Sequence, residues 1–403
     1  MRTTTIRMAA GLSVAAILLA ACSSTGTTPS PSAASQAPAA SAPATSAGAS
    51  APASAAGSPK AAKDATSAAD MGGVDAVCAA GKAEGQVNLI ATPNNWANYG
   101  QMITDFQTKY GIKVQSDQPD TDSQGEINAA TQLAGTGRQP DIFDLGSVVA
   151  AKNTAMYAPY KPATWADIPD GNKDPNGLWI NNYAGFESIA YDAKLGDITK
   201  VADLKDSKYK GKVALNGDPL KASAGFNGVV MAALANGGSA DNIAPGVDFM
   251  KSLAASGNLI PVNPTDATVA SGQTPIVIDW TYNQGGLIDK LKGQGIDWKI
   301  VIPSDAPPVA AFYNEAINKD AAHPAAARCW VEYVFSDAGQ NTWLKGFALP
   351  VRLAAMQAAG TIDKDALAKV NAPSTPPVQL TQAQIDAATK YLTDNWKFIT
   401  IPS

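Results

Sequence analysis

The chain has 403 residues, with 30 basic and 35 acidic side chains and a net charge of −5. The charges form no basic stripe, which argues against a nucleic-acid partner. A single histidine and three cysteines without a C-x-x-C pair argue against a zinc site of the usual ligand type, and we expect neither a metal nor a cofactor.

Residues 1–21 have the layout of an export signal. Arg2 and Arg7 precede the mostly apolar run 8–21, which is shorter than the about 20 residues of a transmembrane helix. The run leads into Leu-Ala-Ala-Cys at residues 19–22, which resembles a bacterial lipobox. We therefore expect Cys22 to become the first residue and to carry acyl chains such as palmitate, which would anchor the protein on the outer face of the cell membrane. The alternative is an ordinary secretory signal with a cysteine near its cleavage site.

The next segment has the composition of a disordered tether. Residues 23–59 contain no charged and no aromatic side chain. Such a segment cannot bury enough apolar area to offset its conformational entropy, so we expect residues 22–70 to be a lipidated cysteine followed by a flexible tether. The remaining chain is long enough for two domains of ordinary size.

Two cysteines remain after Cys22, and an even pair in an exported chain is a candidate disulfide. Cys78 and Cys329 each lie in a segment with a helical pattern, so a bridge would join the start of the globular part to a late helix. Free buried thiols are the alternative. His323 precedes Pro324, which is typical of the first residue of a helix, so this histidine is expected at or near a helix cap.

From residue 75 on, short apolar runs alternate with amphipathic segments. Strands are predicted at 87–91, 112–114, 141–145, 213–215, 275–279 and 298–302, and helices at 75–84, 99–110, 126–134, 224–235, 247–255 and 324–335. This alternation predicts an α/β fold of βαβ units with mostly parallel sheets. Ligands bind such sheets beyond the carboxyl ends of the strands.

Three blocks resemble the extracellular solute-binding proteins of bacterial ABC importers, in the group with ferric-ion, polyamine, thiamine and phosphonate binders. The blocks are Gly-Thr-Gly-Arg-Gln-Pro-Asp-Ile-Phe-Asp at 135–144, Asp-Leu followed by Tyr-Lys-Gly-Lys and Asp-Pro within 202–219, and the segments 318–327, 335–340 and 349–352. The resemblance implies a two-lobed type II periplasmic-binding-protein fold with a ligand in the cleft between the lobes.

The same resemblance implies how the chain is divided. It places two hinge crossovers near 185–192 and 310–317. One lobe would combine 75–184 with 312–403, and the other would be 185–311. It also implies a monomer that captures a small solute and delivers it to a membrane permease.

Segments after the predicted strands supply the candidate site. Asp279, Trp280 and Tyr282 combine a carboxylate with two aromatic rings, which suits an organic cation. Ser147 and Ser223 lie at expected helix starts, where free N–H groups suit an anion. The expected ligand-binding residues are Asn95, Trp96, Ser147, Tyr183, Ser223, Asp279, Trp280, Tyr282 and Glu315. In the structural alternative, Asp279 caps a helix and the aromatic rings fill a core.

The ligand class follows from the same residues. Ferric binders of this group use adjacent tyrosines, and this chain has no Tyr-Tyr pair. We expect a polyamine-like or other small organic cation, with an organic anion (phosphonate, sugar phosphate or carboxylate) as the alternative. Ser207 and Lys210 match the S-x-x-K motif of acylating serine enzymes but lack its partner motifs, so we expect no enzyme. A secreted hydrolase and an adhesive surface lipoprotein are the alternatives of another class.

Overall fold

The computed structural model describes residues 59–370, 372–373 and 375–402. The expected signal peptide, Cys22 and most of the expected tether therefore lie outside the described residues.

The described chain becomes ordered before the expected end of the tether. Short 3-10 turns form at Ala62–Asp64 and Ala68–Met71, and Ala65 between them is buried. The guanidinium of Arg328 donates a hydrogen bond to the Ala65 carbonyl oxygen at 2.9 Å. The tether expected over 22–70 is therefore too long at its C-terminal end, because a buried arginine fixes the backbone there.

Helices and strands alternate along the chain as predicted. The helices are α1 (Val74–Glu84), α2 (Tyr99–Tyr110), α3 (Ser123–Gln132), α4 (Ser147–Ala150), α5 (Ser223–Ala235), α6 (Ala244–Ser256), α7 (Asp266–Ala270), α8 (Thr281–Lys292), α9 (Pro324–Val334), α10 (Asp337–Lys345), α11 (Leu353–Ala359), α12 (Lys364–Lys369) and α13 (Gln382–Asn395). The strands are β1 (Gln86–Ile90), β2 (Lys113–Asp117), β3 (Ile142–Gly146), β4 (Tyr157–Ala158), β5 (Ile180–Asp192), β6 (Val213–Leu215), β7 (Ile276–Trp280), β8 (Trp298–Val301), β9 (Ala310–Asn318) and β10 (Leu349–Pro350). Each predicted helix and strand overlaps one of these elements.

The prediction of mostly parallel sheets is wrong. β1 pairs with β2, and β6 with β7, in parallel. All pairings of β5 and β9 with the other named strands are antiparallel, because these two long strands run through the middle of the sheet in opposite directions. Hydrophobic patterns predict where strands lie but not which strands pair.

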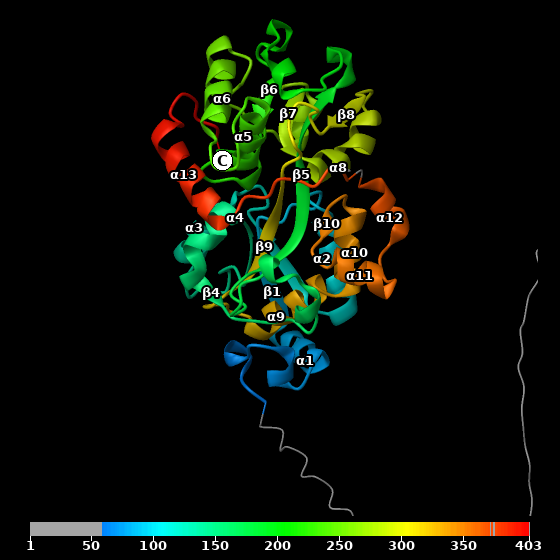
Figure 1. Ribbon diagram of the computed structural model, residues 1–403. Helices are drawn as coiled ribbons and strands as arrows, with labels where there is room; N and C mark the ends of the chain where they lie inside the picture. The colour runs from blue at the N-terminus through cyan, green and yellow to red at the C-terminus, as the bar shows by residue number, and fades with distance from the viewer. Residues whose placement is uncertain (1–58, 371, 374, 403) are drawn as a thin grey trace, which may run out of the picture. The chain divides into compact units, whose positions relative to one another are not determined.

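Two hydrophobic cores lie at the two ends of β5, and we call the parts built on them lobe 1 and lobe 2. The lobe 1 core joins α1, α2 and α9 to β1. The lobe 2 core joins α5 and α6 to β6 and β7. The first half of β5 pairs with β9 and β10, and its second half pairs with β7 and β8, so this strand belongs to both lobes (Figure 1). The arrangement is the two-lobed type II periplasmic-binding-protein fold.

The C-terminal segment returns across the hinge rather than staying with lobe 1. Val378 forms a parallel bridge with Val309, next to the start of β9. The following helix α13 contacts both α4 and α6, and it buries Ile385 and Leu392 in the lobe 2 core (Figure 1). The last residues of the segment expected to belong to lobe 1, 312–403, are therefore packed on lobe 2. The hydrophobic pattern of α13 predicts an apolar face but does not indicate which lobe that face packs against.

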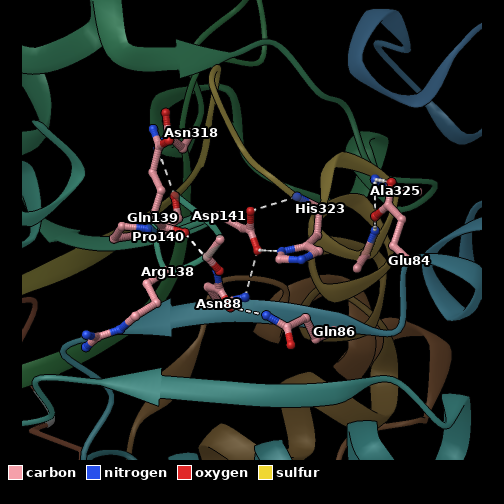
Figure 2. Close-up of polar contacts among 12 residues, drawn as sticks. Glu84, Gln86, Asn88, Arg138, Gln139, Pro140, Asp141, Asn318, His323 and Ala325 are labelled. Carbon is pink, nitrogen blue, oxygen red and sulfur yellow. Dashed lines mark hydrogen bonds and ion pairs between the residues drawn. The ribbon is translucent and has the colours of Figure 1, made fainter. Parts of the chain in front are cut away.

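The start of α9 is tied to distant parts of lobe 1. Cys78 of α1 and Cys329 of α9 form a disulfide with their Cα atoms 4.8 Å apart. His323 is the N-cap residue of α9, as predicted, and its Nδ1 lies 2.8 Å from the Asp141 carboxylate. Figure 2 shows Asp141 between His323 and Asn88, with Glu84 accepting from the first N–H groups of α9. These contacts hold the N-terminal end of α9 to β1 and to the chain before β3.

Candidate functional site

A cavity of about 500 Å³ lies between the lobes and is strongly acidic. Lobe 1 and lobe 2 both contribute to its wall. Its carboxyl groups are Asp120, Asp122, Glu126, Asp144, Asp266 and Asp279. Among the described residues that line it, none is Lys, Arg or His. The lining itself therefore offers negative charge without a basic side chain, although Asp266 pairs with Lys290 outside the lining.

Asp279 occupies the lobe 2 wall at the end of β7 and is held by three amide side chains. It is buried, and its carboxylate accepts hydrogen bonds from Asn216 Nδ2 at 2.7 Å, from Gln284 Nε2 at 2.6 Å and from Asn283 Nδ2 at 3.1 Å. Gln284 Oε1 in turn accepts from Trp298 Nε1 at 3.1 Å. The position of Asp279 is thus fixed by donors from α8 and from the residue after β6, and Trp298 of β8 holds Gln284 in place.

Asp144 and Glu126 occupy the lobe 1 wall. The Asp144 carboxylate accepts from Asn182 Nδ2 at 2.9 Å and from the Tyr183 hydroxyl at 2.8 Å. The Glu126 carboxylate accepts from the backbone N–H of Asp144 at 2.9 Å. Behind them, Glu315 shares Asn182 as a donor, also at 2.9 Å. The two lobes therefore each present buried carboxyl groups to the same cavity or to its base.

Burial sets the titration of these groups. Loss of solvent raises the pKa of Asp279 to about 6 and that of Asp144 to about 6. Burial, and then the nearby charge of Asp144, raises the pKa of Glu315 to about 8. Burial also raises the pKa of Glu187, whose two oxygens have no hydrogen-bond partner among the described residues. A bound cation would favour the ionised form of each group near it.

Aromatic rings form the boundary between the lobes. Trp96 and Tyr313 line the cavity, with ring centroids 5.6 Å apart in an edge-to-face arrangement. Trp96 Nε1 donates to the Tyr183 hydroxyl at 2.6 Å. Trp280 and Tyr282 pack behind these rings as part of the lobe 1 core, although they belong to lobe 2 by chain order. This cluster closes the base of the cavity.

The predicted site residues separate into three groups. Asn95, Trp96 and Asp279 line the cavity. Tyr183, Trp280, Tyr282 and Glu315 are almost fully buried and do not reach the cavity wall. For Trp280 the reason is the alternation of side chains along a strand, which places it on the opposite face of β7 from Asp279.

Ser147 and Ser223 line a second, smaller cavity of about 230 Å³. Side chains alternate along β9, so Tyr313 faces the acidic cavity while Phe312 and Asn314 face the smaller one. The two expected helix starts also touch each other, because a Cβ added at Gly146 would lie 2.5 Å from the Ser223 Cβ. The approach of these two helix starts leaves no room between them for an anion, and the α5 start borders the acidic cavity through Ala222 and Ala224.

The sequence analysis missed most of the acidic wall. Asn283 and Gln284 lie four and five residues after Asp279, directly after the predicted site residue Tyr282. Asp144 lies inside an apolar strand and Glu126 inside a helix, where a single acid among buried neighbours gives no local signal. Their grouping is a result of tertiary packing.

The mouth of the cavity carries a contact between the lobes. Asn95 Nδ2 donates to Asp266 Oδ1 at 2.8 Å, and Lys290 Nζ lies 3.1 Å from Asp266 Oδ2. Asn95 follows β1 of lobe 1, whereas Asp266 begins α7 of lobe 2. Asn95 therefore meets the opposite lobe directly.

The model of the family described as bacterial extracellular solute-binding protein matches residues 140–373, more than half of the chain. The chain belongs to this family. The matched part ends before the segment that leads into α13. No curated protein sequence matches the chain. Within the described residues, no helix has the length and apolarity needed to cross a membrane.

Solved structures of similar fold share little sequence with this solute-binding protein. The periplasmic binding protein AfuA from Actinobacillus pleuropneumoniae, with fructose-6-phosphate bound, has a TM-score of 0.59 at 16% identity and covers 77% of this chain and 98% of its own. Iron-bound HitA from Pseudomonas aeruginosa has a TM-score of 0.57 at 20% identity, covering 78% and 99%. A putative spermidine/putrescine ABC transporter protein from Listeria monocytogenes has a TM-score of 0.56 at 14% identity, covering 78% and 99%. These likenesses establish the fold.

Proposed function

We propose that this solute-binding protein captures a small organic cation of the polyamine type for an ABC importer. The observation that carries the proposal is the cavity wall, which has six carboxyl groups and no basic side chain among the described lining residues. Of the six, Asp266 forms an ion pair, with Lys290 outside the lining. Carboxyl groups from both lobes line the cavity, so a ligand with more than one positive charge can neutralise both walls. Trp96 and Tyr313 add ring faces, each of which contributes about 0.5–2 kcal/mol to cation binding.

Two features argue against iron as the cargo. In the described part of the chain, no group of three or more His, Cys, Asp or Glu side chains is placed to hold a metal ion. Burial and then the Asp144 charge raise the pKa of Tyr183, which opposes formation of the phenolate that a ferric ion binds.

The anion alternative has a less favourable site. It depends on the helix starts at Ser147 and Ser223, which touch each other, and the α5 start borders the acidic cavity with Ala222 and Ala224. An anion in the acidic cavity would face the carboxyl groups without a compensating cation. The neighbour with bound fructose-6-phosphate therefore shares the fold with this chain but offers no support for the same ligand class.

The lipobox-like junction supports a membrane anchor. In this proposal Cys22 carries the lipid, and the tether lets the binding unit reach the permease from the outer face of the membrane. Replacing Cys22 with Ser should move the protein from the membrane fraction to the soluble fraction of the producing cells. Retention of the variant on the membrane would contradict the lipid anchor.

A ligand panel tests the proposed cargo. Thermal unfolding of the full-length chain would be followed with polyamines, thiamine, phosphonates, sugar phosphates and ferric citrate. A ligand present at 100 times its Kd adds about 2.7 kcal/mol to the free energy of unfolding, which gives a clear rise in Tm. A rise with putrescine or spermidine is expected. A rise only with an anion or with ferric citrate would refute the organic cation and keep the role in solute binding.

A further inference from the structure

The lobe 2 wall of the acidic cavity has hydrogen-bond acceptors left over. Asn216, Asn283 and Gln284 each donate from the side-chain amide nitrogen to Asp279. Asn283 Oδ1 and Asn263 Oδ1 are buried and have no hydrogen-bond partner among the described residues. Both asparagines line the cavity.

The orientation of Asn283 follows from its partner. Its Nδ2 lies 3.1 Å from each oxygen of Asp279, and a carboxylate accepts but does not donate. The amide nitrogen must therefore face Asp279, which leaves Oδ1 as the free end. A buried acceptor without a donor is costly, and a ligand that supplies an N–H group removes that cost.

Small organic cations differ in the donors that they can supply. A primary ammonium has three N–H donors and a guanidinium has five. A quaternary ammonium has none, although it can bind an aromatic and acidic cavity through charge and ring faces alone. Trp96, Tyr313 and the carboxyl groups would accept either kind of cation. The carboxylates and the unpaired acceptors distinguish them, because each forms a hydrogen bond only with a cation that has N–H groups.

We infer that the site selects cations that carry N–H groups over N-methylated cations of the same charge, and that Asn283 is a residue that determines this specificity. The inference rests on the proposed function, since it assumes that an organic cation occupies this cavity. In the bound state, the cationic group beside Asp279 donates one N–H to the carboxylate and another to Asn283 Oδ1. A trimethylammonium group would leave Asn283 Oδ1 unpaired and would place methyl groups against it.

The test compares 1,4-diaminobutane with its bis(trimethylammonium) analogue, two dications with the same carbon chain. Isothermal titration calorimetry on the full-length protein should show the diamine binding at least about tenfold more tightly, the effect of one satisfied buried acceptor. Asn283→Leu removes one free acceptor and should lower this ratio several-fold, leaving the preference that the carboxylates and Asn263 Oδ1 give. Asn216→Leu is the matched control, because it removes an equivalent donor to Asp279. It should weaken both ligands and keep the ratio.

The outcomes separate this inference from the proposed function. Equal binding of the two dications by the native protein would overturn the inference and leave the cation-binding function standing. If neither dication binds, both the inference and the proposed cation-binding function are overturned. A ratio equal to the native value in a folded Asn283→Leu variant, with Tm measured to establish folding, would overturn the role of Asn283. The comparison of the two ligands on the native protein decides the selectivity even if a variant does not fold.

Discussion

Replacement of Asp279 by Asn would remove the central charge of the lobe 2 wall, and its effects on stability and on binding should have opposite signs. Burial raises the pKa of Asp279 from 3.8 to about 6. A raised pKa in the folded state means that this group contributes stability below its unfolded pKa and that the contribution is lost as the pH rises through about 6. The shift of about 2 pH units corresponds to about 3 kcal/mol at 1.36 kcal/mol per unit.

The ligand-free Asp279→Asn variant should therefore be more stable than the native protein at pH 7.5. Asn retains an acceptor for Asn216 and Asn283 but places an N–H group against Gln284, which costs about 1 kcal/mol. The expected net gain is roughly 1–2 kcal/mol at pH 7.5 and disappears near pH 4. Urea unfolding at the two pH values measures it.

Binding should change in the opposite direction. A hydrogen bond to a charged group contributes about 1.5–3 kcal/mol, so the affinity of Asp279→Asn for 1,4-diaminobutane should fall about 10- to 100-fold. Calorimetric titration at pH 7.5 gives this number on a variant whose stability is known. An affinity within about twofold of the native value would refute the reasoning, because it would place the cation away from Asp279.

Three further changes have defined outcomes. Cation affinity should fall below pH 6, by up to about tenfold per pH unit for each linked proton, because Asp279 and Asp144 take up protons as the pH passes through about 6; calorimetry from pH 7.5 to 4.5 measures this, and a flat profile would contradict it. Leu392→Ala should lower the free energy of unfolding by about 2–5 kcal/mol, since Leu392 is fully buried in the lobe 2 core, whereas exposed Lys390→Ala on the same helix should change it by less than about 0.5 kcal/mol. Equal effects of the two would show that α13 is not packed on lobe 2. Cys78→Ser should lower the free energy of unfolding by about 2–5 kcal/mol. In the denatured wild-type protein, mass spectrometry should find Cys78 and Cys329 alkylated only after the disulfide has been reduced.

Local sequence patterns predicted the elements well because they depend on neighbouring residues only. The hydrophobic pattern of residues 99–110 predicted a helix, and α2 has the predicted bounds, Tyr99–Tyr110. The apolar run ending at Asp279 predicted a strand with an acid at its end, and β7 places Asp279 in the cavity wall. In both cases the hydrophobic period is set by the geometry of a single element.

Local sequence patterns did not predict which side chains face the cavity, because that depends on how one element packs against another. Trp280 and Asp279 are adjacent in sequence, and no local pattern states which of the two faces the cleft. The same holds for Ser147 and Ser223, which line the smaller cavity and not the acidic one. Asp144 and Glu126 are 18 residues apart on different elements, and the backbone N–H of Asp144 joins them.

The sequence by itself determined the order of helices and strands, the resemblance to solute-binding proteins and the acid at the end of β7, because each of these depends on residues close together in the chain. Tertiary structure alone decided the antiparallel pairing of β5 and β9, the return of α13 to lobe 2 and the gathering of six carboxyl groups around one cavity. Pairing, docking and charge clustering bring together residues that are far apart in sequence, so their free energies arise only when the lobes have formed.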